Sequence, residues 1–539
     1  MREIAASQNG PFVVGIDAGT SVIKSVAFDL DGRQVAVASR PNRFTTSAGG
    51  AAEQDMARTF TDAAATLREL QEQLPGGAAS ILAVAVTGQG DGTWLIDASG
   101  EPVGPAWLWL DGRAGEVASA MARDTRHRHH FRTTGTGVNP CQQGAQLLEM
   151  KRNHRHLLDR AATAFHCKDW LYFKLTGVRA SDPSEAVFTF GDFRTRQYDR
   201  SVIDNLGLSA EARLLPPIVD GLKQSHPLSG TAAAACGLVA GTPVVLGYVD
   251  FVATAVGGGL VSESEDAGCS ILGSTGMHER FVRRPEDVLL NSEESGYVAL
   301  LPFESSMAQI QSNMAATLNV DWLLDLARSI LRDEGVDLGR EALVRRLDER
   351  VLGAEALASI YHPYISAVGE RGPFMDPLAR AQFVGLHAGL GFYDLMRAVL
   401  EGIAFATRDC YSGTGAVPAE IRLTGGAARS RAMRTILASV LGASVRVVEQ
   451  EEAGAAGAAM TAVVQQGVFP DMMAATRVWT TPRLSPPTRP DPSLTGLYDE
   501  GFELYRDLRR AAGPTWARFD AIKRHHTPDR PSGLPAESE

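Results

Sequence analysis

Two segments of this 539-residue chain follow one plan, and this repetition constrains the fold more than any other feature. Residues 12–29 read as an apolar strand FVVGI, a turn DAGTS and a second strand VIKSVAFD. Residues 267–282 repeat the order of apolar strand, GST turn and strand. Such runs predict hairpins whose exposed amides can face a ligand. The repetition predicts two similar α/β halves, divided near residue 260.

Other segments fill in this plan. Apolar periodicity predicts helices and strands in both halves. The predicted helices are 56–73, 144–154, 394–407, 431–441 and 497–512, and the predicted strands include 81–88, 244–250, 421–423 and 445–448. A proline-rich stretch follows residue 480, and a polar tail from His525 is expected to be disordered. We therefore expect domains at 1–258 and 259–480, and a C-terminal helix with its tail at 481–539.

Composition narrows the class of partner. The net charge of −11 argues against a nucleic-acid binder or a protein that binds anionic membranes. Five cysteines, none in a CxxC pair, favour neither a disulfide framework nor a zinc site. The first residues lack an apolar signal core, and Asp250 and several glycines interrupt the most apolar stretch, 243–261. We expect a cytoplasmic protein that binds small molecules, and a homodimer stays open.

The two turns are candidate phosphate sites. In the first turn (residues 17–21), Gly19 lets the backbone approach an anion closely, and the Thr20 hydroxyl adds a donor. A carboxylate repels phosphate, so the natural role of Asp17 is to hold hydrated Mg²⁺. The second turn (residues 273–276) offers the same chemistry. One such turn is as often an ordinary hairpin turn as a site, but two in corresponding places favour phosphates held between the halves.

Three further segments are candidates. Asp250 is a lone carboxylate in an apolar, Gly-rich run, where it is either the N-cap of a helix beginning at Phe251 or a base that accepts a proton from a substrate hydroxyl. Gln89 and Asp91 follow a strand and have groups that read polyol hydroxyls, although a plain turn fits nearly as well. The Gly-Gly loop (residues 425–430) joins a strand to a helix, where packing is the commoner role.

Two conspicuous features are expected to be inert. The run Arg126-His127-Arg128-His129-His130 has metal-binding residue types, but its polar, Arg-rich surroundings favour a solvated surface. Trp94, Trp107 and Trp109 alternate with apolar residues, so most of them are expected in the core, with room for one to stack on a ligand.

Taken together, the motifs resemble those of the FGGY carbohydrate kinases from about Val13 to Val464. The quoted segments occur in that family's order: GIDAGTSVIKSVAFD, AVTGQGDGT, WLWLDGR, CKDWLYFKLTG with SDPSEA, GYVDFVATAVGGG, ILGSTG, and TGGAARS followed by EEAGAAGAA. The most specific is AQFVGLHAGLGFYDLMRAVLEG at 381–402, with ISAVGERGPFMDPLARAQFVGL around its start. The resemblance implies an α/β fold of two actin-like domains with a ligand cleft between them.

The resemblance also implies roles for particular residues. Asp250 falls on the catalytic base and Asp17 near Mg²⁺. Gln89 and Asp91, with Phe251 beside the base, fall where family members bind substrate. The remaining implied contacts are with ATP: Gly19, Thr20 and Lys24 at the phosphates, Gly273, Ser274 and Thr275 as the second phosphate loop, and Gly425, Gly426 and Ala427 as the adenosine loop.

Departures from the family pattern affect the substrate rather than the reaction. Pentulose kinases typically have Met-His, and glycerol kinases Arg-Glu, where this chain has Gly90-Asp91. The position after the base is Phe251 rather than Asn or Gln, and a usual lysine is replaced by Gln146. An acid without a neighbouring arginine suits an uncharged, hydroxyl-rich ligand.

These departures suggest a substrate. The segments GQGDGTWLID and CQQGAQLL look most like those of erythritol kinases, so the resemblance implies ATP-dependent phosphorylation of a primary hydroxyl of a small polyol. The alternatives are a pentulose kinase, acting on xylulose, L-xylulose or ribulose, a non-catalytic actin-like ATP-binding protein, and a polymer-forming or chaperone-type ATPase.

Overall fold

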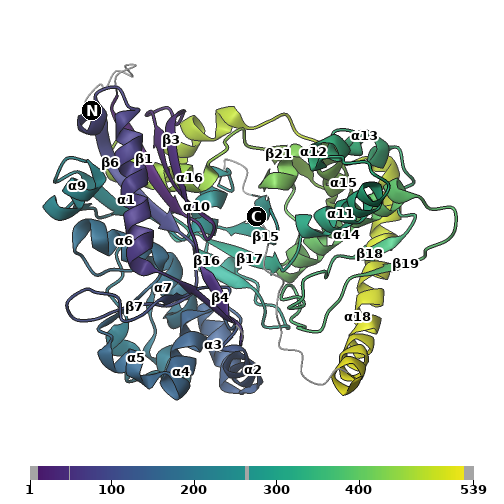
Figure 1. The fold of residues 1–539 in the computed structure, drawn as a ribbon, viewed down its shortest axis with the longest axis horizontal. Coiled ribbons are helices and arrows are strands. Elements are labelled where there is room, and N and C mark those ends of the chain that lie inside the picture. Colours follow the sequence, from purple (N-terminus) through teal and green to yellow (C-terminus); the bar gives the residue numbers. More distant parts are fainter. Residues whose placement is uncertain (1–9, 48, 262–265, 527–539) are drawn as a thin grey trace.

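The computed structural model describes residues 10–47, 49–261 and 266–526, and within them the chain builds two six-stranded mixed sheets. The N-terminal segments, purple and blue, lie at the left of Figure 1, and most of the green and yellow C-terminal segments lie at the right. The predicted α/β fold with two halves is thus confirmed. The chain positions at which the domains begin and end stay predictions.

The first sheet is built by the N-terminal half. Its strands, in spatial order, are β12 (His226–Pro227), β13 (Pro243–Leu246), β6 (Ile81–Gly88), β1 (Phe12–Ala18), β2 (Val22–Phe28) and β3 (Gln34–Pro41). β1 and β2 pair as the predicted antiparallel hairpin, whereas β6 lies parallel to both β1 and β13. Because parallel strands end at the same edge of a sheet, the segments after β1, β6 and β13 meet there.

The second sheet repeats this topology. Its spatial order is β16 (Tyr297–Leu300), β17 (Met307–Asn313), β15 (Gly276–Val282), β14 (Ala267–Leu272), β20 (Glu420–Thr424) and β21 (Ser444–Val447). β14 and β15 form the second predicted hairpin, and β20 lies parallel to β14 and β21. Strands β14, β15 and β17 therefore correspond to β1, β2 and β3, and the repetition predicted from the two turns extends to whole sheets.

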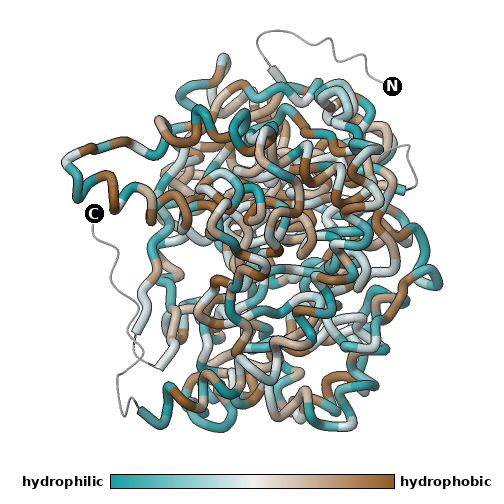
Figure 2. The backbone as a smooth tube through the Cα atoms, turned by 90° about the vertical axis from the view of Figure 1, so that its right-hand side faces the viewer, coloured by the Kyte–Doolittle hydropathy of each residue, from teal (hydrophilic) through white to brown (hydrophobic). Residues whose placement is uncertain are grey.

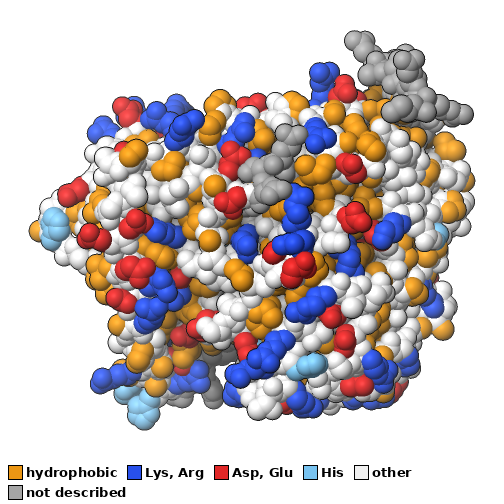
Figure 3. Space-filling model, turned by 180° about the vertical axis from the view of Figure 1, so that it is seen from behind, with side chains coloured by type: hydrophobic (Ala, Val, Ile, Leu, Met, Phe, Trp, Pro, Cys, Tyr) orange, Lys and Arg blue, Asp and Glu red, His pale blue; other side chains and the backbone are white. Residues whose placement is uncertain are grey.

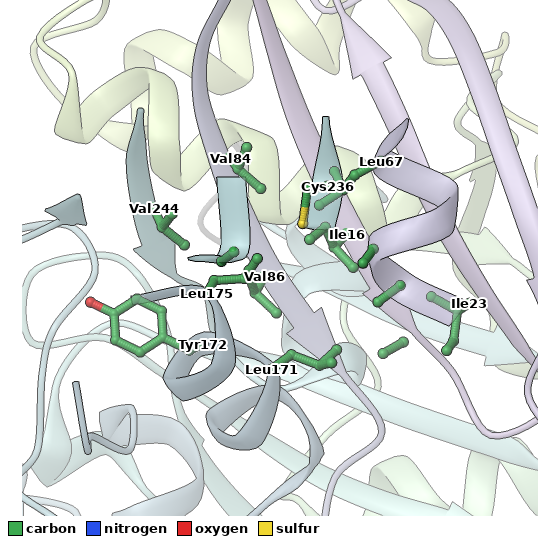
Figure 4. Close-up of a cluster of buried hydrophobic side chains, with 14 of the residues drawn as sticks. Ile16, Ile23, Leu67, Val84, Val86, Leu171, Tyr172, Leu175, Cys236 and Val244 are labelled. Atoms are coloured by element: carbon green, nitrogen blue, oxygen red, sulfur yellow. The ribbon is translucent and has the colours of Figure 1, made fainter. Parts of the chain in front are cut away.

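Helices cover one face of each sheet. On the N-terminal sheet, α1 (Met56–Glu72), α6 (Cys167–Thr176) and α9 (Gly230–Cys236) bury alternate residues of β1. Figure 4 shows this cluster, with Ile16 and Val86 of the sheet facing Leu67 and Leu171 of the helices. On the C-terminal sheet, α14 (Phe392–Gly413) and α15 (Arg431–Leu441) do the same. The alternation of buried residues follows from the two-residue period of a strand.

Two helices, α10 (Asp250–Gly257) and α16 (Ala453–Gln465), cross where the two halves meet. A Cβ added to Gly257 would lie 2.1 Å from the Ala453 carbonyl oxygen, and one added to Gly457 would lie 1.9 Å from that of Ala253. The contact is reciprocal, since each helix presents a glycine to the backbone of the other. Only glycine permits this approach at both positions.

The segment after the second sheet returns to the first. α16 packs on β1 and β6, and α17 (Met472–Trp479) extends the same apolar cluster. At its end, Trp479 stacks at a tilt against Phe28 and donates a hydrogen bond from Nε1 to the Leu30 carbonyl oxygen at 2.9 Å. The second face of the N-terminal sheet is therefore covered by residues that follow β21 in the sequence.

The last helix is longer than predicted. α18 spans Thr495–His526, with Pro514 inside it, whereas the sequence pattern placed its end at Ala512. Ala512 and Trp516 are both buried on the C-terminal half, so packing on either side of Pro514 keeps the chain helical. His525 and His526 are helical, so the predicted disorder is wrong for them, and the rest of the predicted tail lies outside the described residues.

The remaining elements connect these layers. They are β4 (Thr45–Ser47), β5 (Ala51–Gln54), β7 (Trp94–Ile96), β8 (Ala106–Trp107), β9 (Thr163–Phe165), β10 (Gly191–Asp192), β11 (Gln197–Tyr198), β18 (Ile360–His362), β19 (Gln382–Val384), α2 (Gly115–Arg123), α3 (Arg126–Thr134), α4 (Gln143–Asn153), α5 (Arg155–Arg160), α7 (Pro183–Phe190), α8 (Arg200–Asn205), α11 (Thr317–Asp333), α12 (Arg340–Val344) and α13 (Leu347–Leu352).

The surface has mixed character. Hydrophilic segments dominate the periphery of Figure 2, and the face in Figure 3 carries basic and acidic side chains interspersed. No helix in the described part of the chain is long and apolar enough to cross a membrane.

Candidate active site

Asp250 lies at the start of α10, where the segment after β13 enters the helix. The helix begins at Asp250 itself with Val249 as its N-cap, so the expected capping role, with the helix starting at Phe251, is displaced by one residue. Oδ1 of Asp250 accepts a hydrogen bond from the Phe251 amide at 2.7 Å, and Oδ2 accepts none from the described residues. Burial raises the pKa of Asp250 well above its usual value, and the carboxylates of Asp17 and Glu185 raise it further.

Asp17 lies beside Asp250 at the end of β1. Burial raises its pKa to about 6, and the nearby Glu452 carboxylate adds to this rise. A Cβ on Gly454 would lie 2.3 Å from Asp17 Oδ2, so this glycine makes room for the carboxylate. Lys24, which the resemblance places at the phosphates, pairs with Glu452 at 2.8 Å. The first turn thus meets the segment that precedes α16.

A chain of hydrogen bonds fixes the first turn against the segment after β6. Thr20 Oγ1 accepts a hydrogen bond from Trp109 Nε1 at 2.8 Å and donates one to Gln89 Oε1 at 3.1 Å. Gln89 Nε2 in turn donates to Gln54 Oε1 at 2.8 Å. Trp94 and Trp107 lie in the core as expected, while Trp109 is partly exposed beside the turn. Trp109 is one of the three tryptophans that the sequence singled out, and it hydrogen-bonds Thr20. Gln54 is a functional candidate that sequence reasoning missed, since nothing in its local pattern singles it out.

Asp91 has one oxygen without a partner. Its backbone adopts φ +56°, which places it in a tight turn, and its amide donates to Glu185 Oε1 at 2.8 Å. Oδ2 accepts a hydrogen bond from Cys141 Sγ at 3.2 Å, whereas Oδ1 is buried and has no hydrogen-bond partner among the described residues. A buried acceptor without a donor is costly, so Asp91 is ready to accept a hydrogen bond from a ligand.

A buried cluster of charged side chains holds Glu185, which accepts the hydrogen bond from the Asp91 amide. Lys168 Nζ contacts Asp169 Oδ1 at 2.8 Å, Asp182 Oδ1 at 2.6 Å and Glu185 Oε2 at 2.8 Å, and all four side chains are inaccessible to solvent. His166, Asp169 and Glu185 have the spacing of a metal site, but the Lys168 ammonium already supplies the positive charge between the two carboxylates. The cluster therefore fixes Glu185, which holds the Asp91 amide.

The second turn and the Gly-Gly loop lie together. Gly273 O accepts hydrogen bonds from both the amide and the hydroxyl of Thr317 at the start of α11, each at 2.9 Å. The hydroxyls of Ser274 and Thr275 make no hydrogen bond with the described residues. A Cβ on Gly425 would lie 2.6 Å from the Leu272 carbonyl oxygen, so the loop at the end of β20 lies directly against the end of β14.

Residues of the Gly-Gly loop differ in exposure. Gly426 is exposed, and a Cβ there would meet nothing within 4 Å, while Ala427 is buried behind it.

The predicted binding residues fall into two groups. Asp17, Gly19, Thr20, Lys24, Gln89, Asp91, Asp250 and Phe251 lie around the edge of the first sheet, and Gly273, Ser274, Thr275, Gly425, Gly426 and Ala427 lie at the matching edge of the second.

The histidine-rich run is only half solvated, which corrects the expectation for it. The run lies on α3, where Arg126, Arg128 and His129 are exposed but His127 and His130 are buried and stack with ring centroids 6.0 Å apart. Helical geometry explains this, because positions three apart share a face. Burial lowers the pKa of His130 to about 3, so this side chain is neutral.

Comparison with known proteins gives a consistent result. Residues 12–257 match the N-terminal domain of the FGGY family of carbohydrate kinases, and residues 271–466 match its C-terminal domain. The chain is 50% identical over 519 residues to the erythritol kinase of Brucella abortus (strain 2308), covering 96% of this chain and 100% of that protein. It is 28% identical to the xylulose kinase of Escherichia coli (strain K12), covering 80% of this chain and 84% of that one.

Solved structures share the fold. A gluconate kinase from Lactobacillus acidophilus superposes with a TM-score of 0.84 at 22% identity, covering 94% of this chain and 99% of that chain. Plasmodium falciparum glycerol kinase with ADP gives a TM-score of 0.75 at 18% identity, covering 96% and 98%. At these identities the likeness concerns the arrangement of the two halves.

Proposed function

This chain belongs to the FGGY family of carbohydrate kinases, and on that premise we propose that it phosphorylates a primary hydroxyl of erythritol with ATP. The 50% identity to an erythritol kinase over the whole of that protein is the observation that carries the substrate. The arrangement around Asp250 supports the reaction, because a carboxylate with one unpartnered oxygen lies between the Asp17 and Asp91 regions.

Asp250 acts as the general base. Oδ2 receives the proton of the substrate hydroxyl, while the Phe251 amide holds Oδ1 and so fixes the plane of the carboxylate. A raised pKa makes the ionised carboxylate a stronger base. Phosphoryl transfer depends mainly on such positioning and on the neutralisation of charge around the transferred group.

Asp17 suits a magnesium ion. Its carboxylate is a hard oxygen ligand of the type that Mg²⁺ prefers. Burial and the Glu452 carboxylate raise its pKa, and a bound cation would oppose both effects. When bound, the cation would supply positive charge next to the phosphates and offset the negative charge that Asp17 imposes on Asp250. Only one protein carboxylate is needed, since Mg²⁺ keeps several water ligands.

The two turns hold the nucleotide. In this proposal the amides and hydroxyls of Gly19 and Thr20, with the Lys24 ammonium, bind phosphates from one side. The unpartnered hydroxyls of Ser274 and Thr275 bind them from the other. Gly425, Gly426 and Ala427 offer bare backbone to adenosine next to the second turn, a position supported by the contact between Gly425 and β14.

Gln89, Asp91 and Phe251 define the polyol site. The unpartnered Oδ1 of Asp91 accepts a substrate hydroxyl. The Gln89 amide oxygen and one amide N–H already have protein partners, so Gln89 contributes its remaining N–H and orients Thr20. The Phe251 ring lies within 3.4 Å of the Cβ position of Gly90 and limits the width of the site.

A substrate panel tests the proposal. Erythritol, glycerol, xylitol, D-xylulose, L-xylulose and D-ribulose are compared in an ADP-coupled assay with saturating ATP and Mg²⁺. We expect the highest kcat/KM for erythritol. A higher value for a pentulose would favour the pentulose kinase alternative, and ATP hydrolysis that no polyol or ketose stimulates would contradict a kinase function altogether.

The setting of the enzyme is also a proposal. The five cysteines are all unpaired and buried, which suits the reducing cytoplasm. A homodimer stays a prediction that light scattering on the purified protein would test.

A further inference from the structure

Arg371 belongs to the C-terminal half, in the segment between β18 and β19, and its backbone is held rigidly. Glu370 Oε1 accepts hydrogen bonds from the amides of Met314 at 2.8 Å and of Arg371 at 2.9 Å. A Cβ on Gly372 would lie 2.5 Å from the Ser312 carbonyl oxygen, so the chain at this point lies directly on the end of β17. The segment thus has one fixed position relative to the second sheet.

The guanidinium of Arg371 keeps most of its donors free. Nε donates to Ser312 Oγ at 2.9 Å, and among the described residues its two terminal nitrogens have no acceptor. An arginine carries five N–H donors and stays charged at any physiological pH. Four N–H donors of this partly buried arginine have no acceptor among the described residues, so they are available to a ligand.

Arg371 faces the N-terminal half. Its partner Ser312 lies on the same face of β17 as Ile310, which pairs with Tyr297 of β16. This face packs on the N-terminal half, since the Tyr297 ring meets Phe188 edge to face with centroids 6.1 Å apart. Phe188 is on α7, the helix that carries Glu185 and through it holds the Asp91 amide.

Residues 137–141 of the N-terminal half contact both Tyr297 and Asp91. Asn139 Nδ2 donates to the Tyr297 hydroxyl at 3.1 Å, and the Gly137 amide donates to the Gly296 carbonyl oxygen at 2.9 Å. Two residues after Asn139, Cys141 donates to Asp91 Oδ2. Burial raises the pKa of Asp91, and the hydrogen bond from Cys141 and the positive charge of Arg371 oppose this rise.

We propose that Arg371 and Asp91 together bind the hydroxyls at the end of the polyol remote from Asp250, with Arg371 as the donor from the C-terminal half and Asp91 Oδ1 as the acceptor from the N-terminal half. The inference rests on the proposed function and extends it. The sequence alone suggested an acid without a neighbouring arginine, and the fold supplies that arginine from a position far along the chain.

The pair explains selection for a neutral, hydroxyl-rich chain. A guanidinium offers parallel N–H groups to the oxygens of a vicinal diol, and a carboxylate accepts their hydrogens. Opposite charges in the protein leave no net charge for the substrate to neutralise. Because the two groups come from different halves, a polyol long enough to reach both also links those halves.

Two variants test the role of Arg371: Arg371→Met and Arg371→Lys. For Arg371→Met we expect kcat/KM for erythritol to fall about 10- to 100-fold, mostly through KM, as for the loss of charge-assisted hydrogen bonds. Glycerol, shorter by one carbinol, should lose less than about threefold, since an interaction that it does not make cannot be removed. The kcat/KM of Arg371→Lys for erythritol should lie between those of the wild type and Arg371→Met, because lysine keeps the positive charge but lacks the parallel N–H donors of the guanidinium.

Controls separate this role from a structural one. Arg380→Met removes a partly buried arginine of the same segment whose Nη1 donates to backbone carbonyls, and it should leave the erythritol-to-glycerol ratio unchanged. Calorimetry should give the same affinity of Arg371→Met for a non-hydrolysable ATP analogue as the wild type has. Circular dichroism and the melting temperature establish that each variant is folded.

The results that would overturn the proposal are distinct from those that would overturn the proposed function. An unchanged erythritol-to-glycerol ratio in folded Arg371→Met, or a loss confined to nucleotide affinity, contradicts the role of Arg371. A wild-type enzyme inactive on erythritol contradicts the proposed function instead. In that case the same ratio, measured on the preferred substrate and its homologue shortened by one carbinol, decides on Arg371.

Discussion

Lys24 and Glu452 form an ion pair at 2.8 Å although 428 positions separate them in the chain. The pair joins the first hairpin to the segment that leads into α16, next to Asp17. Its two oxygens and one ammonium lie at a partly exposed edge, so its contribution to stability is small.

The first prediction concerns Lys24. If its ammonium also reaches the phosphates, Lys24→Met should raise KM for ATP about tenfold, as expected when one charge-assisted contact is lost. Glu452→Gln removes the carboxylate partner but leaves the Lys24 ammonium in place, so it should raise KM for ATP far less. Initial rates at varied ATP and fixed erythritol measure both, and equal effects of the two variants would assign Lys24 to the ion pair alone.

Asp250→Asn tests the base. We expect kcat to fall about 10²–10⁴-fold with KM for both substrates nearly unchanged, the range for loss of a general base. Single-turnover rates and circular dichroism provide the measurement and the folding control. Asp287→Asn, a partly exposed acid on the C-terminal half, is the control and should retain full activity. Near-normal turnover by folded Asp250→Asn would remove Asp250 from this role.

The ionised Asp17 carboxylate is predicted to lower the stability of the ligand-free protein. Its folded-state pKa of about 6 lies above the ordinary aspartate value of 3.8, so stability is lost as pH rises between these values and the whole cost is present at pH 7.5. Asp17→Asn should therefore raise the melting temperature of the ligand-free protein by about 2–4 °C.

The same variant should abolish turnover and any stabilisation by Mg²⁺. Differential scanning fluorimetry with and without Mg²⁺ tests this, with Asp29→Asn, at the end of the same hairpin, as the control that should still respond. Stabilisation of Asp17→Asn by Mg²⁺ equal to that of the wild type would count against Asp17 as the metal ligand.

Glu279 gives a prediction for pH. Neither carboxylate oxygen of this β15 residue has a hydrogen-bond partner among the described residues, and burial raises its pKa well above the usual value. A raised folded-state pKa means that the wild type loses stability as pH rises above the unfolded-state value of 4.5. Glu279→Gln removes this loss.

The free energies of unfolding of wild type and Glu279→Gln should diverge as pH rises, by at most about 1.4 kcal/mol per pH unit for one proton. Urea unfolding at a series of pH values measures the difference. Exposed Glu286→Gln serves as the control and should run parallel to the wild type. Parallel curves for Glu279→Gln would mean that Glu279 ionises without penalty.

Gly457→Ala tests the helix crossing. Its Cβ would lie 1.9 Å from the Ala253 carbonyl oxygen, so the helices must separate, at a cost of about 1–3 kcal/mol or more, as for overpacking. Gly496→Ala, in α18 with nothing within 4 Å of the Cβ position, should have no effect or stabilise slightly. Equal stabilities of these two variants in chemical denaturation would contradict the close crossing.

Local patterns were sufficient to predict what is encoded locally. Both hairpins, the strand at 81–88 and the helix at 431–441 follow from periodicity and turn residues, and the structure confirms them. The helix predicted at 497–512 was too short, because its continuation through Pro514 depends on tertiary packing on both sides of that residue.

The missed residues share one property. Gln54, Glu185 and Arg371 reach the site from elements far along the chain from Asp91 and Thr20. Glu185 and Arg371 lie within quoted motifs, but no spacing rule connects them to Asp91 or Thr20. Only the fold shows that Glu185 holds the Asp91 amide or that Arg371 faces the N-terminal half.

The return of α16 and α17 to the first sheet has a consequence for synthesis. One face of β1 and β2 stays without its apolar cover until residue 479 has left the ribosome, although both strands are made within the first 30 residues. The N-terminal half therefore cannot complete its core until most of the chain has been made, and a fragment ending near residue 260 would leave Val13, Val26 and Phe28 without part of their apolar cover. The chain should accordingly need protection from chaperones for most of its translation, and it should resist division into separately expressed halves.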